Sequence, residues 1–399
     1  MHRARWRSER DAPPPERVVL ADDTLTADAA YRLANAGTAL LWRGDFHNAR
    51  QLLQALARRI DRPSHSRQRQ QRRRAALAPD PTAADPATGD PAAFHRHRQA
   101  QAQRARVLSS VLIGLGPDFA NPLRRAPDWR DACTAAWGAP AADAVPSVVS
   151  LRELQGVASA HEWRNKGVTV PALGERIHPH YGVYSPLRGE YVHLVDQAPL
   201  PEACRAADGV AFDIGTGSGV LAALLVRRGV TRVVATDLEP RALACAADNL
   251  QRLGLADQVS LQAADLFPDG QAALIVCNPP WIPARPGAPI ERAVYDEGGR
   301  MLAGFLAGLA QHLLPGGEGW LVLSDLAEHL GLRSRSALTT MFADAGLKVV
   351  GRLDTRPHHA KVDDTEDALH KARKAEVTSL WRLVAAPATP AGPTGQDKG

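Results

Sequence analysis

The sequence predicts an α/β fold, a doubly wound, seven-stranded and mostly parallel sheet preceded by a small helical N-terminal domain. From Val210 onward, short apolar runs alternate with helical segments of about 10–15 residues, the pattern of a parallel sheet with crossover helices. The first run ends in three glycines at alternate positions, as in a strand-to-helix turn that lies close to a ligand. At 399 residues the chain is longer than most single domains, which predicts a second unit.

In the N-terminal part, residues 1–23 are expected to be a disordered basic tail and residues 24–145 a helical accessory domain. Leucines recur at spacings of three and four over 24–61, which predicts a helical hairpin in which Gly44 ends one helix and Asp45 caps the next. Residues 62–93 have almost no apolar side chains and are predicted to form a disordered insertion rich in Arg and Pro. Further helices are expected over 95–115 and 129–137.

The C-terminal part is expected to contain a β-rich connector with a substrate segment (146–200), a catalytic domain (201–386) and a disordered tail (387–399). The predicted strands of the catalytic domain are 210–214, 232–236, 258–262, 273–277, 320–323, 348–353 and 378–384. The predicted helices between them are near 218–228, 240–253, 299–314 and 334–345. The last two strands have no obvious helix between them.

The composition is that of an ordinary soluble protein, with 45% hydrophobic and 23% charged residues. No apolar run approaches the roughly 20 residues that a bilayer requires, and the basic N-terminus leads into prolines rather than a secretory signal. A cytoplasmic location away from membranes is therefore expected. The four cysteines (Cys133, Cys204, Cys245, Cys277) lie far apart without a CxxC pair, so reduced and mostly buried thiols are expected.

The positive charge belongs to the N-terminal region. Residues 1–150 contain 23 Arg against 15 acidic residues, whereas residues 151–399 contain 25 basic and 28 acidic residues. An Arg-rich region could contact RNA or DNA, because neutralised phosphates release counterions. The same region is rich in Ala and Pro, and a solvated linker explains it slightly better.

The strongest local signal is VAFDIGTGSGVLAALLVRRG, an apolar strand that breaks into Gly215, Gly217 and Gly219 and continues as a helix. Glycines let the backbone approach a ligand closely, and the helix N-terminus supplies free amides, so a nucleotide-like ligand is expected. A dinucleotide is disfavoured, since its GxGxxG fingerprint would need glycine where Val220 stands. Asp213, at the end of the strand, suits a cofactor with a positively charged amino-acid part.

Two further acids follow the next two predicted strands. Asp237 lies about 20 residues after the glycine turn, where a carboxylate can accept both hydroxyl protons of an adenosine ribose. Asp265 is placed to accept from the adenine amino group, with Leu266 or Phe267 over the ring. A helix N-cap is the structural alternative for Asp237, although it does not explain the spacing.

The sequence LIVCNPPWIP follows as the fourth strand and its loop. Asn278 offers a side-chain carbonyl, and the rigid turn of Pro279 and Pro280 leaves the Pro279 backbone carbonyl outside any ladder. Two acceptors in a fixed frame suit an NH2 group on a planar system, and Trp281 supplies a face on which that plane can stack. A polar turn without function is the alternative.

With these motifs in this order, residues from about 168 to 385 resemble the class I S-adenosylmethionine-dependent methyltransferases of Rossmann-like fold. They resemble in particular the "methyltransferase small" group with an NPP-aromatic motif, and in layout the release-factor glutamine-N5 methyltransferases. The resemblance implies S-adenosylmethionine as cofactor, bound by the residues of the glycine turn and of the three strand ends after it: Asp213, Gly215, Thr216, Gly217, Gly219, Asp237, Leu238, Asp265, Leu266 and Asn278.

The resemblance also implies catalytic roles for Asn278, Pro279, Pro280 and Trp281, although the family usually has tyrosine at the last position. If the ring of Trp281 provides only a stacking face, Trp281→Tyr is expected to retain most activity. The segment YSPLRGEY resembles the Pro-Arg-containing segment that approaches the substrate in those enzymes, which assigns Tyr184, Pro186 and Arg188 to substrate contact.

The expected function is therefore methyl transfer to a planar NH2 group of a macromolecule, a protein glutamine amide in the first place. An exocyclic amine of rRNA, tRNA or DNA shares every motif and stays open, and a non-catalytic scaffold is a distant third reading. No metal is expected, because the histidine pairs at 178 and 180 and at 358 and 359 lack helical i,i+4 spacing and an obvious acidic partner.

Overall fold

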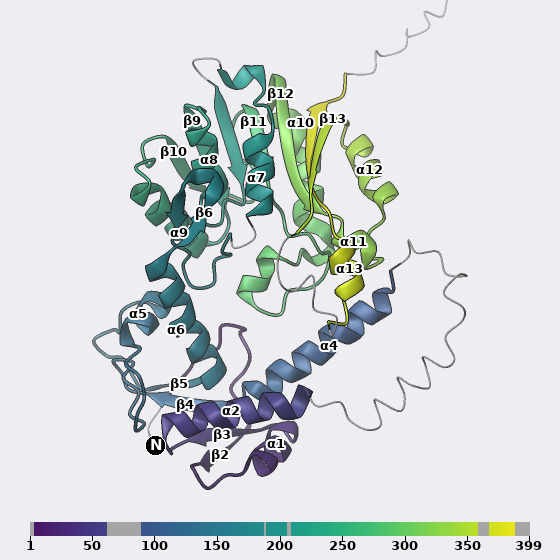
Figure 1. Cartoon of the computed structure of the whole chain (residues 1–399). Coiled ribbons are helices and arrows are strands. Elements are labelled where there is room, and N and C mark those ends of the chain that lie inside the picture. Colours follow the sequence, from purple (N-terminus) through teal and green to yellow (C-terminus); the bar gives the residue numbers. More distant parts are fainter. Residues whose placement is uncertain (1–3, 62–88, 187–188, 206–208, 358–366, 388–399) are drawn as a thin grey trace, which may run out of the picture.

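The computed structural model describes residues 4–61, 89–186, 189–205, 209–357 and 367–387. The described residues form an N-terminal unit around a five-stranded sheet and a C-terminal unit around a seven-stranded sheet, drawn below and above in Figure 1. Residues 62–88 of the insertion predicted at 62–93, the tail beyond 387, and Arg188 lie outside the described residues.

The C-terminal sheet has the strand order β10-β9-β8-β11-β12-β14-β13. Its strands are β8 (Val210–Ile214), β9 (Arg232–Asp237), β10 (Val259–Ala263), β11 (Ala272–Cys277), β12 (Leu313–Ser324), β13 (Leu347–Thr355) and β14 (Thr378–Ala385). β14 pairs antiparallel with both of its neighbours, and the neighbouring pairs from β10 to β12 are parallel. The predicted seven-stranded, mostly parallel sheet is confirmed.

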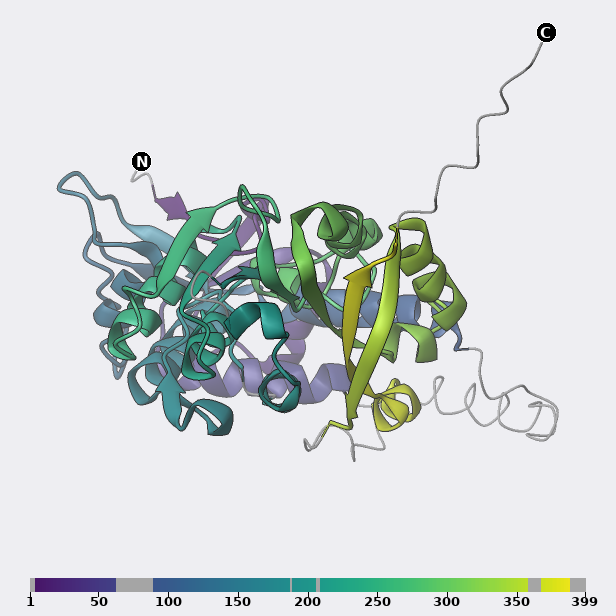
Figure 2. The same ribbon diagram turned by 90° about the horizontal axis from the view of Figure 1, so that it is seen from above.

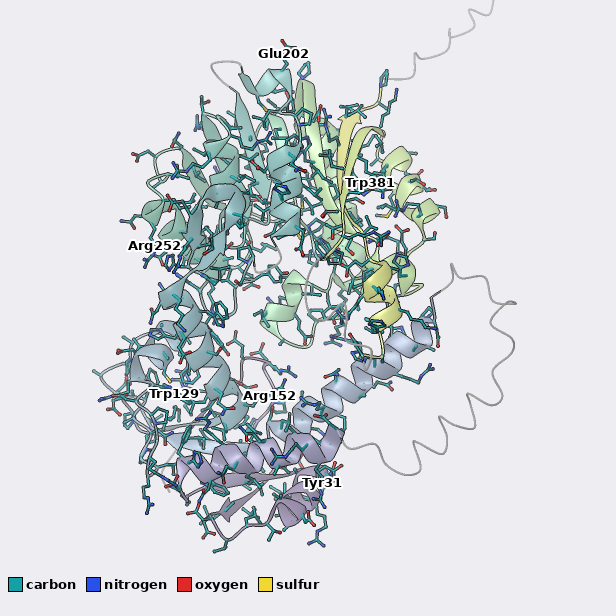
Figure 3. All side chains as sticks on the ribbon, in the orientation of Figure 1. Tyr31, Trp129, Arg152, Glu202, Arg252 and Trp381 are labelled. Carbon is teal, nitrogen blue, oxygen red and sulfur yellow. The ribbon has the colours of Figure 1, made fainter. Side chains whose placement is uncertain are left out.

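Helices cover both faces of this sheet, as Figure 2 shows from above. One face packs on α7 (Glu190–Gln197), α8 (Val220–Arg227) and α9 (Pro240–Arg252), and the other on α10 (Arg300–His312) and α12 (Arg335–Asp344). Strand β11 is buried along its whole length, as expected for a central parallel strand covered on both sides. The strand and helix predictions for this unit hold to within a few residues at most boundaries, although β12 starts seven residues before the predicted strand. Between the last two strands, where no helix was evident in the sequence, the structure has the short helix α13 (His370–Ala375).

The N-terminal unit is not the predicted helical domain. Its sheet has the order β1-β5-β4-β3-β2, with β1 (Arg5–Trp6), β2 (Arg17–Ala21), β3 (Thr38–Trp42), β4 (Val111–Leu115) and β5 (Ser147–Ser150). The helices that accompany it are α1 (Ala27–Asn35), α2 (Phe46–Asp61), α4 (Pro91–Leu108), α5 (Arg130–Trp137) and α6 (Leu151–Lys166). The unit is therefore α/β, like the C-terminal one.

The error arose from short apolar runs, whose periodicity does not separate a strand from a helix. Leu40 and Leu41 fit a helical spacing but lie in β3, where they pair with the neighbouring strands β2 and β4. The capping prediction was sound, since the Asp45 carboxylate accepts the backbone N–H of His47 at the start of α2.

Three boundaries also differ from the prediction. The expected tail at 1–23 contains β1 and β2, and the guanidinium of Arg7 lies over the rings of Phe119 and Trp137. The expected insertion at 62–93 ends earlier, because Asp90 caps α4. The connector at 146–200 is mainly helical, since it contains α6 and α7 besides the short pair β6 (Val168–Val170) and β7 (Glu175–Ile177).

Helix α4 joins the two units. In Figure 1 it runs from the N-terminal sheet toward α11 (Leu326–His329) and α13 (His370–Ala375) of the C-terminal unit. The four cysteines are buried and free, as expected. No described helix combines the length and apolar character that a membrane span requires.

Candidate active site

The glycine turn follows β8 directly. Gly215, Gly217 and Gly219 all have positive φ angles (73°, 57° and 80°), a conformation that other residues rarely adopt. At Gly217 a Cβ atom would meet no heavy atom within 4 Å, so there is open room above the turn. The turn is therefore shaped for close approach of a ligand, and Gly219 places the first amides of α8 beside it.

Asp213 lies beneath this turn and is almost completely buried. Its carboxylate accepts a hydrogen bond from the Thr216 hydroxyl (2.7 Å) and one from the Ala222 backbone N–H (3.0 Å). Burial raises the pKa of Asp213 to about 6, and these two hydrogen bonds oppose the shift. Asp213 thus braces the turn, and its buried charge would be stabilised by a cationic group of a ligand.

Asp237, at the end of β9, lies beside the same turn. One of its oxygens accepts the Gly217 N–H at 3.0 Å, and the other accepts the Glu239 N–H at 2.9 Å. Burial raises the pKa of Asp237. Each oxygen keeps a second lone pair, so both remain able to accept from ribose hydroxyls. Leu238 follows with half of its surface exposed (54%), unusual for leucine and suited to an adenine ring.

The residues after β10 are arranged differently from the prediction. Asp265 is exposed, and its carboxylate lies 3.8 Å from the Arg300 guanidinium. Leu266 has a positive φ of 76°, and its side chain packs toward Gly304 of α10. Phe267 is not free to cover an adenine, because its ring stacks on Phe305 and on His312, with centroid distances of 5.8 and 4.3 Å.

The NPPW sequence lies at the carboxyl end of β11, next to the glycine turn. β11 pairs with β8 so that Cys277 faces Ile214, which brings Asn278 alongside Gly215. The Trp281 indole N–H donates to Asn278 Oδ1 at 2.9 Å. Pro279 is buried, Pro280 is half-buried, and Trp281 packs against the cores on both faces of the sheet.

The sequence did not single out Met301, although it lies in the site. Its Cε atom is 2.6 Å from the position that a Cβ at Gly215 would take, so Met301 covers the first glycine of the turn. Asp296 places it there, since its two carboxylate oxygens accept the Met301 and Leu302 backbone N–H groups at 3.1 Å. Asp296 thus caps the first turn of α10.

The substrate segment predicted around Tyr184 and Pro186 lies near this site. Tyr181, three residues earlier, packs against the N-terminal core, and Pro186 is buried. Burial raises the pKa of Tyr191 on α7, and the nearby Tyr184 and Asp213 add to that shift. The segment therefore runs from the N-terminal unit toward Asp213, whereas its role in substrate contact stays a prediction.

The histidines at 178 and 180 have structural partners. His178 Nδ1 lies 2.6 Å from the Arg164 carbonyl, and His180 Nε2 lies 3.1 Å from Asp248, an acidic partner that the sequence did not reveal. Within the described ranges, no three His, Cys, Asp or Glu side chains are grouped to hold a metal ion. His358 and His359 fall outside those ranges.

The chain is similar in sequence to several methyltransferases. Residues 199–311 match the family model described as Ribosomal protein L11 methyltransferase (PrmA). The chain is 44% identical over 72 residues to the ribosomal protein L11 methyltransferase of Pelotomaculum thermopropionicum, which covers 18% of this chain and 23% of that protein. It is 35% identical over 157 residues to the release factor glutamine methyltransferase of Cereibacter sphaeroides, covering 36% and 54% respectively.

The chain thus spans about a quarter to a half of the length of these relatives. Among solved structures, the ribosomal protein L11 methylase from Lactobacillus delbrueckii subsp. bulgaricus covers half of this chain at 20% identity, with 80% of its own length aligned and a TM-score of 0.33, a likeness too low to bear on function. The family match over residues 199–311 and these sequence matches agree with the expected class, the methyltransferases.

Proposed function

We propose that this protein transfers a methyl group from S-adenosylmethionine to the side-chain amide nitrogen of a protein glutamine. The observation that carries the proposal is the position of Asn278, at the carboxyl end of β11 and alongside the glycine turn, with its Oδ1 already held by the Trp281 indole. A carbonyl fixed in this way is suited to accept one proton of a planar NH2 group.

The residues around the turn fit the cofactor. The open space over Gly217 would receive its amino-acid part, with Asp213 opposite the ammonium group. Asp237 would accept from the ribose hydroxyls, and Leu238 would contact the adenine, with Asp265 and Leu266 at the rim. When bound, the cofactor supplies a methyl group made electrophilic by a positively charged sulfur.

The protein residues then aim the acceptor. An amide nitrogen is a weak nucleophile because its lone pair is delocalised. Hydrogen bonds from its protons to Asn278 Oδ1 and to the Pro279 carbonyl would localise that lone pair and direct it along the carbon–sulfur bond, while Trp281 supports the amide plane. As the nitrogen–methyl bond forms, the methyl carbon–sulfur bond would break with S-adenosylhomocysteine as the leaving group, and the nitrogen would release one proton to solvent. The residues of the protein would contribute mainly by orienting the acceptor.

Similarity to two enzymes named for protein substrates, ribosomal protein L11 and a release factor, favours a protein acceptor. A nucleic-acid amine is the second candidate, and the observation that favours it is the Arg excess of residues 1–150. The two are separated by incubating the protein with methyl-labelled S-adenosylmethionine and cell extract, then treating with protease or nuclease. Label released only by nuclease would reject the glutamine acceptor.

Asn278→Ala tests the site itself. Methyl transfer should fall by about 100- to 1000-fold, the usual loss for one preorganised polar contact in a catalytic site. Affinity for S-adenosylhomocysteine, measured by calorimetry, should stay within about twofold, because the wild-type Oδ1 is assigned to the acceptor. Transfer at the wild-type rate would make the NPPW loop a structural turn.

A further inference from the structure

Residues 282–296, here called the acceptor loop, connect Trp281 to α10. The loop is closed at its base by hydrogen bonds from Ile282 N–H to the Val294 carbonyl (3.1 Å) and from Asp296 N–H to the Ile282 carbonyl (2.9 Å). Because it starts directly after Trp281, any displacement of its base would move the indole that holds Asn278.

Helix α4 of the N-terminal unit contacts this loop. Phe94, one turn before Arg98 on α4, is 1% exposed and packs in one cluster with Ile282, Leu326 and Leu330. Trp281 and Tyr295 pack against the same cluster. Phe94 therefore completes the apolar cluster behind the acceptor loop, although it lies far from the loop in the sequence.

Arg98 adds three polar contacts, all on the loop. Its Nη1 lies 3.2 Å from the Glu291 carboxylate, its Nη2 donates to the Arg285 carbonyl at 2.7 Å, and its guanidinium lies 4.0 Å from the centre of the Tyr295 ring. The Arg98 side chain is three-quarters buried, with 25% of its surface exposed. A planar, multidentate guanidinium can satisfy all three partners at once, which an ammonium cannot.

Ordinary adhesion between two units would also use such contacts. Here, however, the ion pair, hydrogen bond and ring contact of the Arg98 side chain all end on the acceptor loop, and Phe94 shares a hydrophobic cluster with Ile282, the residue next to Trp281. The partly buried ion pair is also worth more than an exposed one, because solvent screens it less.

We propose that Arg98 is a positioning residue for methyl transfer: the N-terminal unit, through α4, holds the acceptor loop and thereby keeps Trp281 and Asn278 in register with the glycine turn. This inference rests on the proposed function of Asn278. It assigns the N-terminal unit a part in the catalytic geometry in addition to any part in recruiting the acceptor.

The test compares Arg98→Ala with Arg96→Ala in the full-length protein. Arg96 lies on the same helix and is exposed, and among the described residues its ion pair is with the exposed Asp90, so it is a matched control. In Arg98→Ala, amide hydrogen exchange over 282–296 should become about tenfold faster or more, because the loop loses the contacts that oppose its opening. Methyl transfer into a fixed cell extract should fall about tenfold or more, with affinity for S-adenosylhomocysteine within about twofold.

Arg98→Lys should recover part of the rate, since it keeps the pair with Glu291 but loses the planar group over Tyr295. If Arg98→Ala does not fold, Glu291→Gln combined with Tyr295→Leu removes two of the contacts from the loop side and should give the same loss. If the wild-type protein transfers methyl groups and Arg98→Ala transfers them equally fast, the inference about Arg98 is overturned, but the proposed function is not. No transfer by the wild type would instead reject the proposed function.

Discussion

The Trp281 indole N–H donates to the same Asn278 oxygen that is proposed to receive the acceptor. A carboxamide without this contact could rotate and present its NH2 group instead of its oxygen. Tyrosine, the usual residue in the NPP-aromatic motif that this sequence resembles, carries its hydroxyl at the far end of the ring and has no donor at the indole N–H position. We therefore expect Trp281 to orient Asn278 in addition to stacking.

Trp281→Tyr and Trp281→Phe should accordingly lose a similar factor in methyl transfer, about tenfold for one neutral hydrogen bond. This expectation reverses the one drawn from the ring alone, in which tyrosine retains most activity. Initial rates with labelled cofactor and a fixed extract measure it. If tyrosine matched tryptophan while phenylalanine did not, a hydroxyl could replace the indole donor; if all three matched, the hydrogen bond would have no role.

Asp213 predicts a pH dependence of cofactor binding. Its pKa of about 6 in the ligand-free protein means that, below pH 6, the carboxyl must lose a proton before it can face a cationic group. Affinity for S-adenosylhomocysteine should therefore be nearly constant between pH 6.5 and 7.5 and fall toward roughly tenfold per pH unit well below pH 6.

Calorimetry between pH 5 and 7.5 checks this dependence. Asp213→Asn should bind more weakly at neutral pH and lose the part of the pH dependence that belongs to Asp213. The pKa of Asp237 is raised as well, so Asp237→Asn is the matched comparison. An Asp213→Asn profile parallel to that of the wild type would assign the pH dependence to another group.

In the turn between β8 and α8, Gly217 faces open room, whereas Gly219 packs against α9. Alanine at Gly217 or Gly219 carries the same penalty for positive φ, roughly 1–2 kcal/mol. At Gly217 the added methyl group enters open space, whereas at Gly219 it would lie 3.2 Å from Ala246 on α9. The two glycines should thus differ in what their substitution damages.

Gly219→Ala should lower the melting temperature more than Gly217→Ala, because α9 must move to admit the methyl group. Gly217→Ala should weaken S-adenosylhomocysteine binding more, relative to its loss of stability, because the methyl group occupies the assigned ligand space. Thermal unfolding and calorimetry on both variants measure the two effects. Equal losses in both measurements would place the ligand elsewhere than over Gly217.

The N-terminal segment around Glu9 contacts both units. Glu153 on α6 accepts the Glu9 backbone N–H at 3.0 Å, and the Glu9 carboxylate lies 2.6 Å from Arg241 on α9. Burial raises the pKa of Glu153 to about 7, from the ordinary 4.5. The folded protein therefore binds more protons at this site than the unfolded chain between these two pH values.

Because the folded protein holds this proton more tightly, the contribution of Glu153 to the free energy of unfolding falls as the pH rises from about 4.5 to 7. Above pH 7 it changes little. Glu153→Gln keeps an acceptor oxygen for Glu9 and removes the titration. The variant should be more stable than the wild type at pH 8 by roughly 1–3 kcal/mol, and should lose this advantage near pH 4.5. This range is below the full shift at about 1.4 kcal/mol per pKa unit, because Glu153 is only partly buried and solvent screens its charge. Denaturant unfolding at both pH values measures it; an equal difference at the two would show that Glu153 does not titrate between them.

The sequence was enough to predict the C-terminal sheet and the methyltransferase class. It was also enough to predict that Asp213, the three glycines, Asp237 and Asn278 meet at one edge of that sheet. Local pattern sufficed because buried parallel strands are continuous apolar runs, and their polar ends meet at one edge of the sheet whatever the details of packing.

The fold of the N-terminal unit and the contact partners of several side chains could be seen only in the tertiary structure. The N-terminal unit is α/β because β3 and β4 find partners far away in the chain, which no local period records. Phe267 stacks on Phe305 of α10, Trp281 donates a hydrogen bond to Asn278, and Arg98 donates one to the acceptor loop. Each of these contacts forms only because whole helices and strands pack together in one way. The sequence therefore gives the residue types but not their contact partners.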